Sequence, residues 1–206
     1  MYTHSKQYIT AGVPLDEAQK AIIMIHGRGA DAQGMISLKS HLPLREMAIV
    51  APQATQHSWY PYSFMAPEAS NQPALDSALE VIGEIVADVT AKGISSENLY
   101  FLGFSQGACL SLEYVARNAQ KYGGVIALTG GLIGQQLNPD RYKGDFKQTR
   151  VFISTNDPDL HVPLKRVEAS VEILKDLNAD TQLKVYPGRP HTITHDELEL
   201  AKAFIF

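Results

Sequence analysis

LYFLGFSQG, residues 99–107, decides the fold, because an apolar run leads directly into a Gly-x-Ser-x-Gly pattern. The pattern is typical of a nucleophile elbow, a sharp turn from strand to helix that lifts a serine hydroxyl above the sheet. Gly103 and Gly107 lie two residues either side of Ser105, where a tight turn leaves little room for side chains. The next residues, ACLSLEYVARN, suit a helix. We therefore interpret Ser105 as a catalytic nucleophile; the alternative is a turn that only needs small residues.

Six short apolar runs alternate with stretches of helical pattern along the chain. Most are apolar throughout, which is typical of parallel strands covered on both faces. Residues 74–92 and 164–174 carry apolar side chains at helical spacing, and residues 196–206 are expected to form a terminal helix. The alternation predicts an α/β fold with a mostly parallel, doubly wound sheet, helices on both faces and sites at the strands' carboxyl ends. The expected strands are residues 21–26, 47–52, 98–103, 124–129, 150–155 and 183–187.

Length and composition limit the class of protein. With no repeat or linker, the 206 residues are expected to form one domain, 1–206, in which residues 133–148 are a surface loop. A net charge of −4 without a basic run argues against a nucleic-acid partner. The apolar runs are far shorter than the ~20 residues that cross a bilayer, and MYTHSKQYIT lacks a signal-peptide core. The lone cysteine, Cys109, fits a reducing compartment, so a cytoplasmic monomer or homodimer without stable membrane insertion is expected.

A serine nucleophile needs a base and a group that orients the base. In this topology the order along the chain should be Ser, then Asp or Glu, then His, each beyond a later strand. The expected strand at 150–155 is followed by NDPDLHVP. Asp159 is favoured as the acid because it begins an Asp-x-x-Val-Pro pattern that leads into the next helix. Asp157 stays open as the alternative, with a role in capping or stiffening the turn otherwise.

Three histidines compete for the role of base. His191 follows the stiff segment PGRP and is favoured, since such a loop can present a side chain at the edge of the sheet. His195 is expected to face solvent where the last helix begins, and His161 to shape its turn. The spacing of His191 and His195 resembles a metal pair, but no helix precedes them and no Glu-x-x-His pattern joins them. No metal site is therefore predicted.

The tetrahedral intermediate of acyl transfer also needs hydrogen-bond donors for its oxyanion. One donor is expected to be the backbone N–H of Gln106, the residue after the nucleophile. The other is expected from the N–H of Arg28 in IHGRGAD, residues 25–31, which lacks the patterns of a phosphate-binding loop. Trp59 and Tyr60 are interpreted as walls of a substrate pocket, with simple packing as the alternative. Cys109 is expected to pack as a small hydrophobic residue.

Together, the motifs GFSQG, HGRGAD, DLHVP and GRPHT resemble those of the phospholipase/carboxylesterase family of small α/β-hydrolases, which includes the acyl-protein thioesterases. The resemblance extends from about residue 21 to the C-terminus. It implies an α/β-hydrolase fold with no large lid and an open site for short or flexible acyl chains. The resemblance implies a triad of Ser105, Asp159 and His191, an oxyanion hole of the Arg28 and Gln106 amides, and a tryptophan, Trp59, near the site.

Two departures from the family pattern concern the substrate. Arg28 stands where many relatives have an apolar residue, and Asn156-Asp157 where many have Gly-Asp. A cation beside the oxyanion hole would favour an acidic or polar acyl group, unless the side chain points outward. Neither departure removes a catalytic group.

The sequence thus predicts a cofactor-free serine hydrolase that cleaves small-molecule carboxylic esters or thioesters through an acyl-enzyme. Its type would be a carboxylesterase, lysophospholipase or acyl thioesterase. One alternative is a non-catalytic ligand-binding protein on the same scaffold. The other is a lactone or dienelactone hydrolase, which a serine rather than a cysteine nucleophile disfavours. A histidine base also predicts activity that rises with pH through about 6–7, where free imidazole loses its proton.

Overall fold

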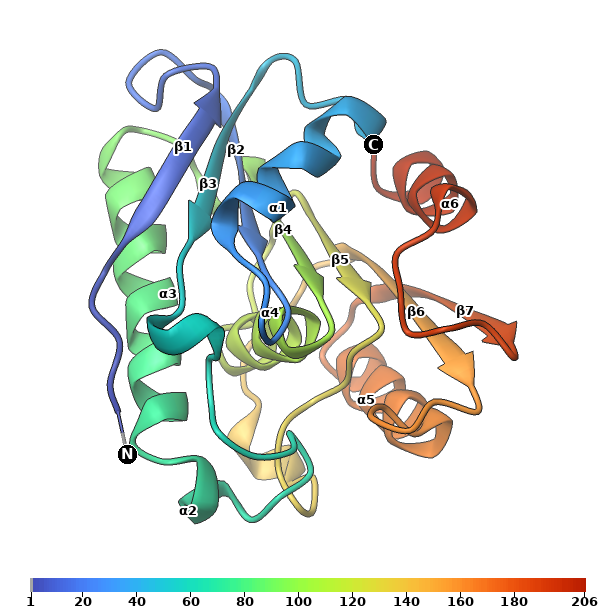
Figure 1. Cartoon of the computed structure of the whole chain (residues 1–206). Helices are drawn as coiled ribbons and strands as arrows, with labels where there is room; N and C mark the ends of the chain where they lie inside the picture. The colour runs from blue at the N-terminus through green and yellow to red at the C-terminus, as the bar shows by residue number, and fades with distance from the viewer. Residues whose placement is uncertain (1) are drawn as a thin grey trace.

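The computed structural model describes residues 2–206 and contains a seven-stranded sheet flanked by helices (Figure 1). The strand order is β1-β3-β2-β4-β5-β6-β7; β1 pairs antiparallel with β3, and the other neighbours are parallel. The predicted α/β-hydrolase fold is thereby confirmed. The strands are β1 Tyr8–Gly12, β2 Lys20–Ile25, β3 Met47–Pro52, β4 Leu99–Phe104, β5 Gly124–Leu128, β6 Arg150–Asp157 and β7 Asp180–Pro187.

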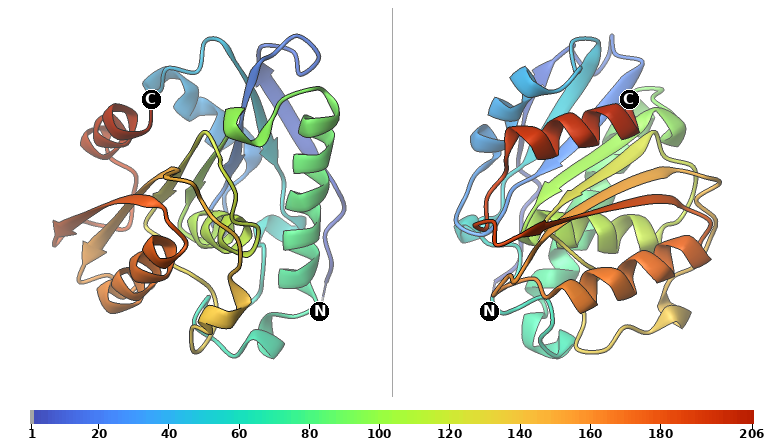
Figure 2. Two further views of the ribbon diagram at one scale, coloured as in Figure 1. Left: turned by 180° about the vertical axis from the view of Figure 1, so that it is seen from behind. Right: turned by 90° about the vertical axis from the view of Figure 1, so that its right-hand side faces the viewer.

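The helices form a layer on each face of the sheet (Figures 1 and 2). Helices α3, α4 and α5 pack against one face, and α1 and α6 against the other. Strand β2 serves both layers: Ile23 and Ile25 face the first, while Ile22 and Met24 face the second. This explains why the central strands are apolar throughout. The helices are α1 Ala32–Ser37, α2 Glu68–Asn71, α3 Ala74–Ala91, α4 Gln106–Arg117, α5 Leu164–Asp176 and α6 His195–Ile205.

The strand order reverses beside β2, and this reversal positions the site. The chain passes from β2 outward to β3 and then returns to β4, which pairs with β2 on its other side. The helices that follow the two neighbours, α1 after β2 and α4 after β4, lie on opposite faces of the sheet. Loops beyond such a switch point diverge and leave a crevice at the carboxyl ends of the strands.

Two sequence expectations need correction. Strand β1 was not predicted; it is a short edge strand that packs only partly on the core. Residues 133–148 are more than a surface loop, because Ile133, Tyr142 and Phe146 are buried. The Tyr142 hydroxyl donates a hydrogen bond to the buried carboxylate of Glu113 on α4 at 3.1 Å, which fixes the segment to the α4 layer.

No helix in residues 2–206 is both long enough and apolar enough to cross a membrane.

Candidate active site

Ser105 occupies the turn between β4 and α4 in a conformation that side chains rarely adopt. Its φ and ψ are 53° and −117°, which costs on the order of 1–3 kcal/mol. Two backbone hydrogen bonds hold the turn: Ser105 N–H donates to Leu128 O at 2.9 Å, and Cys109 N–H donates to Ser105 O at 3.0 Å. A Cβ on Gly103 would collide with the backbone of Gly107. The small residues therefore permit the close crossing of strand and helix that exposes the serine hydroxyl.

The structure brings Ser105, His191 and Asp159 into one chain of hydrogen bonds. Nε2 of His191 lies 2.8 Å from Ser105 Oγ, and Nδ1 lies 2.8 Å from Asp159 Oδ2. An ionised carboxylate can only accept, so Nδ1 carries the proton and donates to Asp159. In the neutral ring Nε2 is then the acceptor for the Ser105 hydroxyl. This is the tautomer that a general base beside a serine requires.

Four donors surround the Asp159 carboxylate. The backbone N–H groups of His161 and Val162 donate to Oδ1 at 2.8 and 2.9 Å. The Asn156 amide donates to Oδ2 at 2.8 Å, beside His191. Burial alone would raise the pKa of Asp159, but the bonds from His191, these two N–H groups and Asn156 outweigh it and lower the pKa to about 2. Asp159 is therefore ionised over the whole range in which an imidazole base works.

This lowered pKa predicts a pH dependence of stability. A carboxyl group whose pKa falls from 3.8 to about 2 on folding adds to the free energy of unfolding above about pH 4. The contribution is lost as the pH falls toward 2, when folded and unfolded states both bind the proton. We expect Asp159→Asn to reduce the free energy of unfolding most at neutral pH, and the gap to close on acidification. Urea titrations at about pH 7, 4 and 3 measure it; a gap that widens toward low pH would contradict the assignment.

The loop that carries His191 is fixed by Arg189, which the sequence reasoning did not single out. Its Nε donates to Asn156 Oδ1 at 2.5 Å, and its Nη2 donates to Glu197 Oε1 at 3.0 Å. The guanidinium also lies 4.1 Å from the centre of the Tyr186 ring. Arg189 and Glu197 have side chains that are 9% and 0% exposed, so this ion pair is shielded from water.

Asn156 joins this cluster to the Ser105–His191–Asp159 chain. Its side-chain amide contacts Asp159 on one side and accepts from Arg189 on the other, and it donates to Pro190 O at 3.3 Å. One buried amide thus connects the end of β6 to the residue before His191. The departure from Gly at position 156 was visible in the sequence, but its pairing with Arg189, 33 residues away, carried no local signal.

Two backbone N–H groups next to Ser105 have no partner. Within residues 2–206, neither Arg28 N–H nor Gln106 N–H donates to an acceptor. Their loops are in close contact: a Cβ on Gly27 would lie 3.4 Å from the Ser105 Cβ, and one on Gly107 would strike the carbonyl of Ile25. The site therefore offers two unused donors beside the serine hydroxyl.

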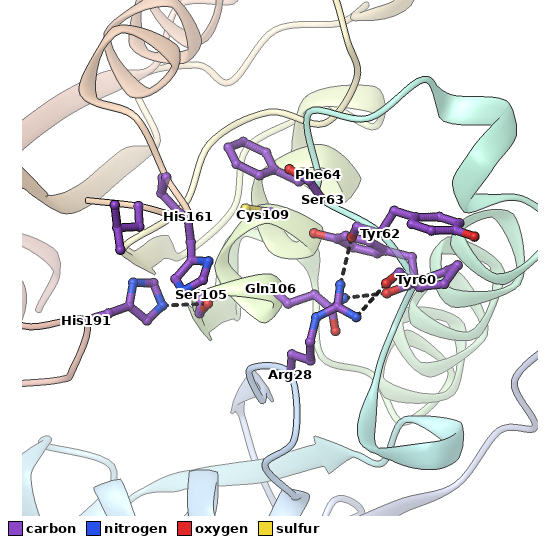
Figure 3. Close-up of a pocket in the computed structure, with 13 residues that line it drawn as sticks. Arg28, Tyr60, Tyr62, Ser63, Phe64, Ser105, Gln106, Cys109, His161 and His191 are labelled. Carbon is purple, nitrogen blue, oxygen red and sulfur yellow. Dashed lines mark hydrogen bonds between the residues drawn. The ribbon is translucent and has the colours of Figure 1, made fainter. Parts of the chain in front are cut away.

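A pocket of about 500 Å³ opens over these groups (Figure 3). Ser105, Gln106 and His191 line it together with Arg28 and Tyr60. The Gln106 side chain anchors one wall, because its Oε1 accepts from Trp59 N–H and its Nε2 donates to Tyr60 O, both at 2.8 Å.

Known proteins were compared with this chain. A sequence model described as Phospholipase/Carboxylesterase matches residues 10–206. The chain belongs to the phospholipase/carboxylesterase family.

Three members of this family show the range of similarity. The crystal structure of a phospholipase/carboxylesterase from Dyadobacter fermentans DSM 18053 is 64% identical, with a TM-score of 0.98, and the match covers 100% of this chain and 98% of that one. Acyl-protein thioesterase 1 of Saccharomyces cerevisiae is 28% identical over 93% of each chain. A probable carboxylesterase SOBER1-like from Arabidopsis thaliana is 26% identical over 74% of this chain, which spans only 59% of that protein's length.

Of the two aromatic residues expected to wall the pocket, only Tyr60 does so. Trp59 does not line the pocket, which corrects the sequence interpretation. Its side chain is fully buried and donates through Nε1 to His26 O at 2.9 Å, so it supports the family's HGRGAD loop from behind. Phe64, Leu160 and Val162 line the pocket instead; they lie in loops with no periodic pattern to reveal them.

The remaining sequence candidates lie as follows. Asp157 ends β6 with an exposed side chain, and only its backbone carbonyl is bonded near the site, accepting from Gly188 N–H at 2.9 Å. His161 lies edge-on to the His191 ring, 5.4 Å between centres, at the rim of the pocket. His195 is exposed at the start of α6. Cys109 is buried, and burial raises the pKa of its thiol to about 12, so it stays a neutral packing residue.

Proposed function

We propose that the protein hydrolyses carboxylic esters or thioesters through an acyl-enzyme formed on Ser105. His191 takes the hydroxyl proton as Ser105 attacks the carbonyl carbon, and then protonates the departing alcohol or thiol. Water, deprotonated by His191, releases the acid and restores the serine. Asp159 keeps the imidazole in the reactive tautomer and stabilises its charged form. The observation that carries this proposal is the chain of two 2.8 Å hydrogen bonds from Asp159 to Ser105 at a pocket.

The oxyanion of the tetrahedral intermediate would be bound by the N–H groups of Arg28 and Gln106. Both are free of other acceptors within residues 2–206, which supports this role. Donors fixed before the reaction need no reorganisation as charge develops, and loss of one such donor typically costs on the order of 3 kcal/mol. Arg28 and Gln106 lie on loops after β2 and β4, so the switch point of the sheet would supply both donors.

Family membership and the intact site favour a catalyst over a ligand-binding protein that retains only the scaffold. No step of the proposed mechanism requires a metal or a cofactor. One sheet with helices on both faces supports a single domain, and the lone buried cysteine is in keeping with a cytoplasmic protein.

Hydrolysis of a p-nitrophenyl ester series from acetate to decanoate tests the proposal. We expect turnover with a short to medium optimum, because a pocket of about 500 Å³ holds a limited acyl chain. Mass spectrometry after a rapid acid quench should find the acyl group on the peptide that contains Ser105. A folded protein that cleaves no ester and no matching thioester would refute the hydrolase assignment.

A further inference from the structure

We propose that the pocket selects esters or thioesters that carry an anionic group, such as a carboxylate, and that the Arg28 side chain binds it. This inference rests on the proposed function, since it names the substrate class of the same site. It concerns the guanidinium of Arg28, whereas the proposed oxyanion donor is the backbone N–H of the same residue.

The Arg28 guanidinium is held in place by neutral groups. Nη1 donates to Ser58 Oγ at 3.1 Å and to Pro61 O at 2.8 Å, and Nη2 donates to Tyr62 O at 2.7 Å. These bonds fix the plane of the guanidinium but do not neutralise its charge. Of the five N–H donors, Nε–H and one N–H of Nη2 have no acceptor within residues 2–206. An oriented guanidinium with spare donors suits a carboxylate, because it loses little side-chain freedom on binding.

The rest of the pocket adds no negative charge. No Asp or Glu belongs to the described residues that line it, and the Asp159 carboxylate is bonded to His191 beneath the surface. In Figure 3 the Arg28 guanidinium and the His191 ring lie on either side of Ser105. The whole chain carries a net charge of −4, so attraction of an anion must come from a local group. Arg28 is the permanent cation that lines this pocket.

The remaining walls fit an apolar portion of the same substrate. Phe64 and Val162 are buried pocket residues, while Leu160 is 96% exposed at the rim. A burial of Phe64 and Val162 with an open Leu160 gives a contact for a hydrocarbon segment, separate from the charged contact at Arg28. The class indicated is therefore an ester with a short apolar part and an anionic group remote from the scissile carbonyl.

Two pairs of esters, each matched in size and leaving group as closely as possible, test this selectivity. For charge on the acyl side, mono-p-nitrophenyl adipate is compared with its methyl-capped diester. For charge on the alcohol side, m-carboxyphenyl butyrate is compared with m-carbamoylphenyl butyrate. The measured quantity is the ratio of kcat/KM for the anionic ester to that for the neutral ester, within each protein. A ratio is unaffected by a general loss of activity.

We expect the ratio in one of the pairs to fall about tenfold in Arg28→Gln, the effect of losing one charge-assisted contact that water partly screens. Arg28→Lys keeps the charge and should retain much of the preference. The matched control is Arg45→Gln, which removes an exposed arginine just before β3, at the opposite end of the strands. The control should leave the ratio unchanged. Rising ionic strength should lower the ratio of the unmodified protein.

A purely structural role for Arg28, bracing Ser58, Pro61 and Tyr62, would lower both rates and leave every ratio unchanged, which overturns the inference. Equal cleavage of neutral and anionic esters by the unmodified protein would also overturn it, while the hydrolase assignment stands. Failure to cleave any of the four esters, or any of the p-nitrophenyl series, would instead defeat the proposed function, and this inference with it.

Discussion

Replacing Ser105 with alanine should lower kcat/KM for p-nitrophenyl esters by about four orders of magnitude or more, because no acyl-enzyme can then form. The remaining rate would come from substrate binding and the two N–H donors. The protein should stay folded, since alanine removes one oxygen from a half-exposed turn. The free energy of unfolding should hold or rise slightly, because alanine meets the same φ of 53° without the serine's polar group against His191.

Ser111 offers a matched control on the same helix. Its side chain is buried in α4, and its Oγ has no hydrogen-bond partner among residues 2–206. Ser111→Ala makes the same chemical change two turns from the reactive position and should leave ester hydrolysis within about twofold. If both variants lost activity equally, the loss would reflect damage to α4. If Ser105→Ala retained most of the rate, Ser105 would not be the nucleophile.

The sequence revealed the parts of this site that depend on local chemistry. A tight turn demands glycines around Ser105, so the nucleophile was visible as a spacing of small residues after an apolar run. Asp159 and His191 follow apolar strands in loops, and the order of chain segments in a doubly wound sheet already implied that they meet. The six interior strands were equally legible, since burial on both faces leaves them uniformly apolar.

What the sequence did not reveal depends on contacts between distant segments. Arg189 and Asn156 are ordinary loop residues until β6 and β7 pair, which brings Asn156 opposite Tyr186 and the following turn within reach of it. Trp59 was misplaced for the same reason: an aromatic residue in a loop packs inward or lines a pocket according to its neighbours. The carbonyls that hold Arg28 could not be foreseen either, because backbone acceptors leave no trace in residue type.

The site also shows how the fold divides its tasks. The loop after β2 and the turn after β4 provide unpaired N–H groups and the serine, and their separation is fixed by glycine contacts. The ends of β6 and β7 provide the acid and the base, and their separation is fixed by the Asn156 amide. Errors in the second pair would alter the tautomer and aim of His191, while errors in the first would alter the oxyanion contacts.

Asp159→Asn should lower kcat for the same esters by about 10³–10⁴-fold, the second largest effect we expect. An asparagine that keeps the backbone donors of His161 and Val162 at its oxygen must turn its N–H₂ toward Nδ1 of His191. Nδ1 then becomes an acceptor, the proton moves to Nε2, and the ring can no longer take the proton from Ser105. Asp157→Asn is the matched control, because it makes the same change two residues away on an exposed side chain. Its kcat should stay within about threefold of the unmodified value. Steady-state rates at about pH 8 decide the matter: a larger loss in Asp157→Asn than in Asp159→Asn would transfer the role of the acid to Asp157.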